Sequence, residues 1–110
     1  IQIEVWGERS LPLDVEKSIF RIIQEALANV SWHSLAERVT LEFEYRSDKL
    51  ILSICDNGKG FVNDRNRIDG MGLQFMSERA TLIGGELMIE TKPGQGTKIT
   101  LIYPYQIMEI

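Results

Sequence analysis

The chain has 110 residues, of which 44% are hydrophobic and 25% are charged, and these are ordinary values for one globular domain. Its net charge is −4 and its Lys and Arg residues form no dense tract, which argues against nucleic acid as a direct partner. No apolar run approaches the roughly 18 residues of a membrane span, and no signal-peptide pattern is visible. The single cysteine, Cys55, excludes an intrachain disulfide and fits a reducing compartment. Because the chain begins with Ile1 rather than Met, we expect it to be part of a longer protein.

A strand, a long helix and a β-hairpin are predicted for the first half of the chain. Apolar and polar residues alternate in the first strand and in the first strand of the hairpin, as in half-buried strands, whereas the second hairpin strand is more apolar, as in a central strand. Ser10 and Pro12 are residue types that begin a helix, and Ser10 is the expected N-cap. The predicted ranges are residues 1–6 for the first strand, from Ser10 to about His33 for the helix, 39–45 and 50–55 for the hairpin strands and 46–49 for the hairpin loop.

A loop, a second helix and a second hairpin are predicted for the second half. Residues 61–69 are polar without an apolar period, so we expect a mobile loop, and Gly84-Gly85 should end the helix that follows it. The predicted ranges are 71–83 for the helix, 86–90 and 97–103 for the strands and 92–96 for the turn. This order predicts a single α/β domain, a two-layer sandwich with a mostly antiparallel sheet and helices on one face. The order of the elements does not suit a Rossmann unit, the Gly-rich turns do not follow the first strand, and a GxGxxG motif is absent.

Glu25 and Asn29 interrupt the apolar face of the predicted long helix. On a helical wheel of about 100° per residue, Asn29 and His33 fall within about 20° of Ile22, and Glu25 about 60° away. Positions i and i+4 are neighbours on a helix face, so Glu25 and Asn29 project toward one point. Burying such groups without partners is costly, so the pair indicates a cleft. Taken alone, the pair also fits an ordinary amphipathic helix whose boundary residues reach solvent.

These helix residues have the chemistry of a magnesium and phosphate site. Magnesium takes few protein ligands and relies on water and substrate phosphates, so the Asn29 carbonyl is a suitable sole side-chain ligand. Glu25 can then orient or deprotonate a nucleophile near a terminal phosphate. His33 lies one turn further on; it contacts phosphate or Glu25, or it only gains from the helix dipole, and both interpretations stay open.

Two glycine-rich turns are the next candidate sites. Asp56 ends an apolar strand just before Gly58 and Gly60; its carboxylate can accept a hydrogen bond from an exocyclic amine such as adenine N6, and the glycines let the backbone approach the base. A simple Asp-Asn-Gly turn is the alternative. Gly70 and Gly72 open the second helix, where free N–H groups favour phosphate. The alternative there is an N-cap glycine at a flexible joint.

Thr97 follows a third glycine turn, at the start of the last strand. Its hydroxyl can bond the nucleobase or the Asp56 carboxylate, although a plain hairpin turn also accounts for it. A carboxylate, an amide, an Asp beside a tight turn and a glycine loop at a helix start are the parts needed to hold a nucleotide with its magnesium. None of these is specific alone, but their order is.

In this order the residues resemble the motifs of the catalytic, ATP-binding domain of a bacterial sensor histidine kinase. That domain belongs to the GHKL superfamily (Bergerat fold), which includes gyrase, the mismatch-repair ATPase and the ninety-kilodalton heat-shock chaperone. The matching segments are residues 24–29 with 33–36 for the N box, 56–61 for the G1 box, 70–73 running into 76–80 for the G2 box, and 94–97 for the late Gly-Thr element. The resemblance covers nearly the whole chain.

The resemblance implies ATP and Mg²⁺ as ligands and assigns roles to single residues. It implies that Asn29 ligates magnesium, that Glu25 assists phosphoryl transfer and that Asp56 selects adenine. It also implies that further residues shape the nucleotide pocket and its lid: His33, Gly58, Gly60, Gly70, Gly72, Leu73 and Thr97.

The wording of residues 24–27 and the short lid resemble the subfamily that signals to response regulators with LuxR-type DNA-binding domains. Two departures occur: Ser34 replaces a usual Ala, and Trp32 stands where a basic or small residue is common, so a basic phosphate contact is lost there. The single histidine, His33, belongs to the N box. The resemblance therefore implies that the phosphoacceptor histidine lies on a separate dimerisation domain outside this chain. It also implies that the chain itself is cytoplasmic, whether or not its parent kinase is anchored in a membrane.

Three functions compete at this point. The first is the catalytic domain of a histidine kinase, which binds Mg-ATP and transfers the γ-phosphoryl group to that histidine. The second is an anti-sigma-factor serine kinase of the same superfamily, and the third is a non-catalytic nucleotide-binding regulatory module. The Gln-Glu-Ala-Leu wording favours the first, and the intact Glu25, Asn29 and Asp56 argue against the third.

Overall fold

The computed structural model describes residues 1–29, 38–58, 72–91 and 94–106. In these ranges the elements are β1 (Gln2–Trp6), α1 (Leu13–Asn29), β2 (Val39–Tyr45), β3 (Lys49–Asp56), α3 (Leu73–Leu82), β4 (Glu86–Thr91) and β5 (Thr97–Pro104). The predicted α/β class and the order of these elements are confirmed. The predicted loop at 61–69 and the predicted end of the long helix near His33 lie outside the described residues.

The start of the long helix differs from the prediction. The N–H group of Glu16 donates to the carbonyl oxygen of Pro12 at 3.0 Å, and α1 begins at Leu13. Pro12 therefore occupies the position before the first helical residue, where its carbonyl accepts the first intrahelical hydrogen bond. Ser10 lies two residues further out, so its prediction as the N-cap was wrong.

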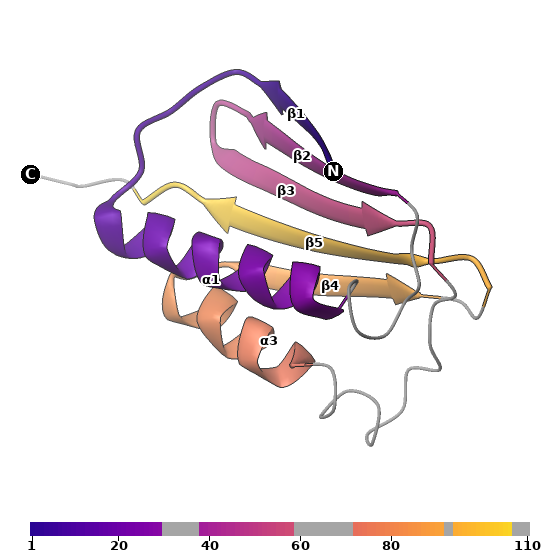
Figure 1. Cartoon of the computed structure of the whole chain (residues 1–110). Coiled ribbons are helices and arrows are strands. Elements are labelled where there is room, and N and C mark those ends of the chain that lie inside the picture. The colour runs from indigo at the N-terminus through magenta and orange to yellow at the C-terminus, as the bar shows by residue number, and fades with distance from the viewer. Residues whose placement is uncertain (30–37, 59–71, 92–93, 107–110) are drawn as a thin grey trace, which may run out of the picture.

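In the described part of the chain, one five-stranded sheet carries α1 and α3 on the same face (Figure 1). Its strand order is β1-β2-β3-β5-β4, in which only the β1–β2 pair is parallel. A parallel pair needs a crossover connection, and α1 lies in the connection from β1 to β2. The other strands pair antiparallel, which confirms the predicted two-layer sandwich with a mostly antiparallel sheet.

The hydrophobic core fills the space between the two helices and the sheet. Alternate residues of the central strands face the helices, so Ile54 lies opposite Ile99 and Leu52 opposite Leu101. Among the described residues, six large side chains are under 2% exposed: Tyr103, Ile22, Leu50, Leu52, Met76 and Leu101. These contacts hold α1, α3 and the sheet together and thereby fix the positions of the polar residues at one end of the core.

Candidate functional site

A row of polar side chains crosses three neighbouring strands where the core ends. Asp56 on β3 lies directly opposite Thr97 on β5, and Thr97 lies directly opposite Thr91 on β4. Directly opposite residues of antiparallel strands place their side chains on the same face of the sheet, here the face toward the helices. The next row inward is apolar: Ile54, Ile99 and Ile89. The strand ends therefore offer hydrogen-bonding groups beside an apolar surface.

The turn after β3 holds the Asp56 carboxylate in place. The Gly58 N–H group donates to Asp56 Oδ1 at 2.8 Å. Asn57 fastens the same turn to the start of β2, because its N–H group donates to the Arg38 carbonyl at 3.2 Å and its Oδ1 accepts from the Arg38 N–H group at 2.8 Å. A carboxylate offers about four acceptor positions, so Asp56 keeps capacity for a ligand after bonding to Gly58.

The β4–β5 turn packs directly on the backbone of Asp56. Gly96 has φ +84°, and a Cβ atom there would lie 3.1 Å from the Asp56 carbonyl carbon and 3.2 Å from the Asn57 Cα atom, and would collide with the Asp56 carbonyl oxygen. A side chain at this position is therefore excluded by backbone contact as well as by conformation. Gly94 has a similar φ of +79°, but a Cβ atom there would meet nothing within 4 Å.

Glu25 and Asn29 lie at the boundary of the buried stripe of α1. Both side chains are half-buried, while Ile22 and Ala26 beside them are buried. The helical-wheel prediction of their position is therefore confirmed. Both side chains carry oxygen atoms that can ligate a metal, and oxygen is the ligand that magnesium prefers.

The start of α3 meets Glu25. Gly72 has φ +68°, and a Cβ atom there would lie 2.7 Å from Glu25 Cδ and 2.8 Å from Cγ. Only a residue without a side chain lets the Glu25 carboxylate come this close to the start of α3. Leu73, the first residue of α3, is 2% exposed and packs in the core, so its side chain anchors the helix start. Its contact with a nucleotide stays a prediction.

The N-terminus of α3 favours negative charge. The Met76 N–H group donates to the Gly72 carbonyl at 3.0 Å, so the N–H groups of residues 73–75 precede the first bond of this type. No side chain of the described residues caps them. The first N–H groups of a helix, together with the helix dipole, attract anions such as phosphate. The ends of α1 and α3 therefore bring a carboxylate, an amide and a helix start that favours anions to one region.

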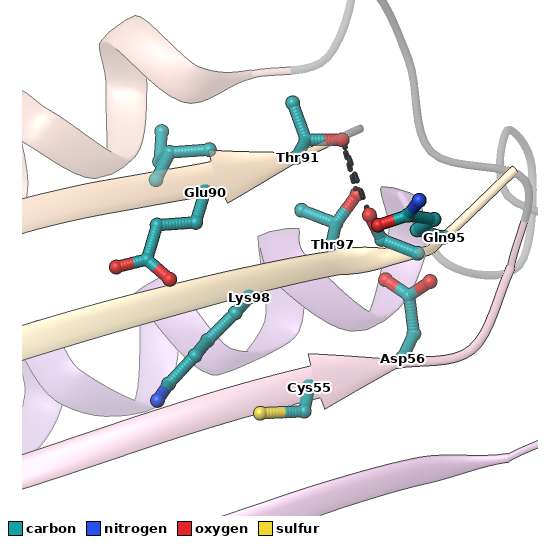
Figure 2. Close-up of a pocket in the computed structure, with 9 residues that line it drawn as sticks. Cys55, Asp56, Glu90, Thr91, Gln95, Thr97 and Lys98 are labelled. Atoms are coloured by element: carbon teal, nitrogen blue, oxygen red, sulfur yellow. Dashed lines mark hydrogen bonds between the residues drawn. The ribbon is translucent and has the colours of Figure 1, made fainter. Parts of the chain in front are cut away.

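A hollow of about 540 Å³ surrounds the polar row (Figure 2). Asp56, Thr91 and Thr97 line it on the helix side, while Cys55 and Lys98, one residue along their strands, point to the other face of the sheet. Burial raises the pKa of the Cys55 thiol above its ordinary value, and the Lys98 ammonium opposes that shift. The thiol is therefore protonated at neutral pH and is a poor nucleophile.

Some predicted site residues lie outside the described residues, and one residue of the site was not predicted. His33, Gly60 and Gly70 belong to the first group. Thr91 belongs to the second, because its hydroxyl lies 3.0 Å from that of Thr97. A threonine at each end of a predicted hairpin turn was the available signal, since residues that flank such a turn face each other across the two strands.

Residues 14–107 match the family described as "Histidine kinase-, DNA gyrase B-, and HSP90-like ATPase". The match covers most of the chain, so the chain belongs to this ATPase family, as its motifs predicted.

The curated relatives are sensor kinases. The chain is 41% identical over 98 residues to the signal transduction histidine-protein kinase/phosphatase DegS of Brevibacillus brevis, covering 89% of this chain and 25% of the relative. It is 43% identical over 90 residues to the sensor histidine kinase LiaS of Bacillus subtilis (strain 168), and the match covers 82% of this chain and 25% of that relative. It is 42% identical over 94 residues to the sensor protein VraS of Staphylococcus aureus (strain COL), and the match covers 86% of this chain and 27% of that relative. The chain thus spans about a quarter of the length of these relatives.

Solved structures support the fold. The histidine kinase domain of the Erythrobacter litoralis blue-light activated histidine kinase superposes with a TM-score of 0.76 at 22% identity, over 94% of this chain and 51% of that chain. The ATP binding domain of PrrB from Mycobacterium tuberculosis superposes with a TM-score of 0.73 at 23% identity, over 97% of this chain and 82% of that chain. Within the described residues, no helix has the length and apolar character needed to cross a membrane.

The contact between Gly96 and Asp56 predicts a difference between two glycine variants. Gly96→Ala and Gly94→Ala both place a side chain at positive φ, which costs on the order of 1 kcal/mol. Only Gly96→Ala also displaces the Asp56 backbone, which should add about 1–3 kcal/mol to its loss of unfolding free energy. Urea denaturation measures both losses, and equal losses would show that the close approach at Gly96 is unimportant.

Proposed function

We propose that this chain is the catalytic domain of a sensor histidine kinase, which binds Mg-ATP and transfers the γ-phosphoryl group to a histidine on a separate dimerisation domain. The observation that carries the proposal is the placement of the Glu25 carboxylate against Gly72 at the start of α3, at one end of a core whose strand ends present Asp56. The resemblance to the motifs of this ATPase family assigns these positions to a base, to phosphate and to a nucleobase. The histidine-kinase relatives favour this function over an anti-sigma-factor serine kinase or a non-catalytic module.

Different residues bind the base, the phosphates and the magnesium ion of Mg-ATP. Asp56, held by Gly58, accepts a hydrogen bond from the exocyclic amine of adenine, with Thr97 beside it. The N–H groups at the start of α3 hold phosphate oxygens, with Gly72 allowing the close approach. Asn29 offers its amide oxygen to Mg²⁺, which when bound neutralises charge on the phosphates. The remaining roles assigned to His33, Gly60, Gly70 and Leu73 belong to the same proposal.

Glu25 acts in the transfer step. A nitrogen of the acceptor imidazole attacks the γ-phosphorus, an N–P bond forms, the bond to the β-phosphate oxygen breaks, and ADP leaves. The imidazole N–H proton passes to the Glu25 carboxylate, directly or through water. Glu25 is half-buried and lies against Gly72 at the start of α3, so its carboxylate is accessible to an incoming partner.

The partners follow from the same proposal. The phosphoacceptor histidine belongs to the dimerisation domain of the parent kinase, and the phosphoryl group then passes to a response regulator. The wording of residues 24–27 supports a regulator with a LuxR-type DNA-binding domain. Because ATP is the phosphoryl donor, we place this domain in the cytoplasm.

Asp56→Asn should weaken ATP binding about tenfold or more. The substitution keeps the shape but removes the charge of the acceptor, and a hydrogen bond to a charged group contributes roughly 1.5–3 kcal/mol, at about 1.4 kcal/mol per decade of affinity. Isothermal titration calorimetry measures the change. The control is Asp48→Asn in the exposed β2–β3 turn, which should leave the affinity unchanged. Equal affinities for all three proteins would remove Asp56 from the site.

Asn29→Ala should flatten the magnesium dependence of ATP binding. The unsubstituted chain should bind ATP more tightly as Mg²⁺ rises, because the ion joins Asn29 to the phosphates. The control is Gln24→Ala, an exposed position on the same helix, which should keep the full dependence. If Asn29→Ala responds to magnesium like the control, Asn29 has only a structural role.

Glu25→Gln should slow phosphoryl transfer by about a hundredfold or more, because general base catalysis contributes roughly 10²–10⁴-fold. ATP affinity should change far less. Labelled γ-phosphate is followed from ATP to the dimerisation domain of the parent kinase, mixed with this chain as a separate protein. The control is Glu16→Gln, which is exposed on the same helix. Transfer at the full rate by Glu25→Gln, or label on His33 of the chain alone, would contradict the assigned roles.

A further inference from the structure

We infer that Thr91 is a positioning residue that fixes the hydroxyl proton of Thr97 and so makes the base end of the site accept hydrogen bonds but not donate them. The inference rests on the proposed function and deepens it, because it names what sets the choice of nucleobase. Thr91 lies at the end of β4, directly opposite Thr97 on β5. Its Oγ1 lies 3.3 Å from the Gly96 carbonyl oxygen and 3.0 Å from Thr97 Oγ1 (Figure 2).

The direction of these two hydrogen bonds follows from counting protons. A hydroxyl group has one proton to donate, whereas a carbonyl oxygen can only accept. The bond to Gly96 therefore uses the proton of Thr91. In the bond between the two hydroxyls, Thr97 must then donate and Thr91 accept. The protons run in one direction, from Thr97 to Thr91 to the Gly96 carbonyl.

This order of protons leaves Thr97 with lone pairs for any further partner. Thr97 is 9% exposed and lies opposite Asp56, whose carboxylate also accepts only. The two neighbouring groups thus present acceptors side by side. An amine, such as the 6-amino group of adenine, satisfies both. A 6-oxo purine places its own lone pairs against them and leaves a desolvated acceptor without a donor.

The Thr91 hydroxyl strengthens the preference for a 6-amino purine over a 6-oxo purine. Without this hydroxyl, the Thr97 proton loses its acceptor and is free to turn toward the Asp56 carboxylate or toward the base, where it can bond a 6-oxo group. Gly96 supports the arrangement, because the turn whose carbonyl receives the Thr91 proton also packs against the Asp56 backbone. The acceptor for the last proton and the carboxylate are therefore placed by one turn.

The test compares the affinities for ATP and inosine triphosphate, which differ in the 6-substituent of the purine. Thr91→Val keeps the β-branched shape but removes the hydroxyl, and we expect the ratio of the two affinities to fall about fivefold, the value of one hydrogen bond, with tighter binding of inosine triphosphate. Thr91→Ser keeps the hydroxyl and should keep the ratio. Thr100→Val, a strand threonine on the opposite face of the sheet, is the matched control and should also keep it.

A second measurement needs no variant. In the unsubstituted protein, the hydroxyl proton of Thr97 should exchange slowly in NMR spectra and lie close to Thr91. An unchanged ratio in Thr91→Val, a lowered ratio in Thr91→Ser, or a Thr97 proton that points to solvent would each overturn the inference. If the unsubstituted chain binds neither nucleotide, the proposed function fails and this inference fails with it; selective ATP binding that Thr91→Val retains overturns the inference alone.

Discussion

The register of β5 between β3 and β4 determines where the polar groups of the strand ends lie. It places Thr97 opposite both Asp56 and Thr91 while Ile99 pairs with Ile54 and Ile89 one step inward. A slip of one residue would turn Thr97 to the other face of the sheet and bring Lys98 into the core. The buried pairs of the central strands oppose that slip. The hydrophobic core therefore specifies the positions of these polar groups as well as the fold.

The second half of the site depends on a contact between helices. Both α1 and α3 pack on the same face of the sheet, and the Glu25 side chain lies against Gly72 in space that a Cβ atom would occupy. The same glycine adopts the positive φ from which the helix begins. Helix packing thus brings a carboxylate from one helix to the anion-binding end of another, although 47 residue positions separate Glu25 from Gly72. The proposed function places the strand ends and the helix ends at one nucleotide site.

Much of the fold could be predicted from local patterns. The alternation in residues 39–45 and the glycines after the second helix gave the strands and the helix end, because these signals lie in neighbouring residues. The start of α1 was misplaced at Ser10, since the carbonyl of Pro12 begins the helix instead. The parallel pairing of β1 at the sheet edge was not predicted, because pairing between distant segments depends on packing rather than on local sequence.

In the candidate site, too, features that depend on neighbouring residues were predicted and contacts between distant segments were not. Glu25, Asn29 and Asp56 were found because each breaks an apolar pattern or precedes a glycine turn. Thr91 was missed because a threonine in a strand is unremarkable until the register shows what faces it. The contact of Glu25 with Gly72 could not be read from either residue, since it arises from the packing of two helices.

The most direct test of this account is an NMR titration of the chain with a non-hydrolysable ATP analogue and magnesium. The account places the nucleotide between the polar row and the start of α3. Backbone amide signals of Gly58, Gly72, Leu73 and Thr97 should therefore shift, while those of Asp48 and Lys49 at the opposite end of the sheet should stay. Shifts confined to that opposite end, or none at saturating analogue, would contradict it.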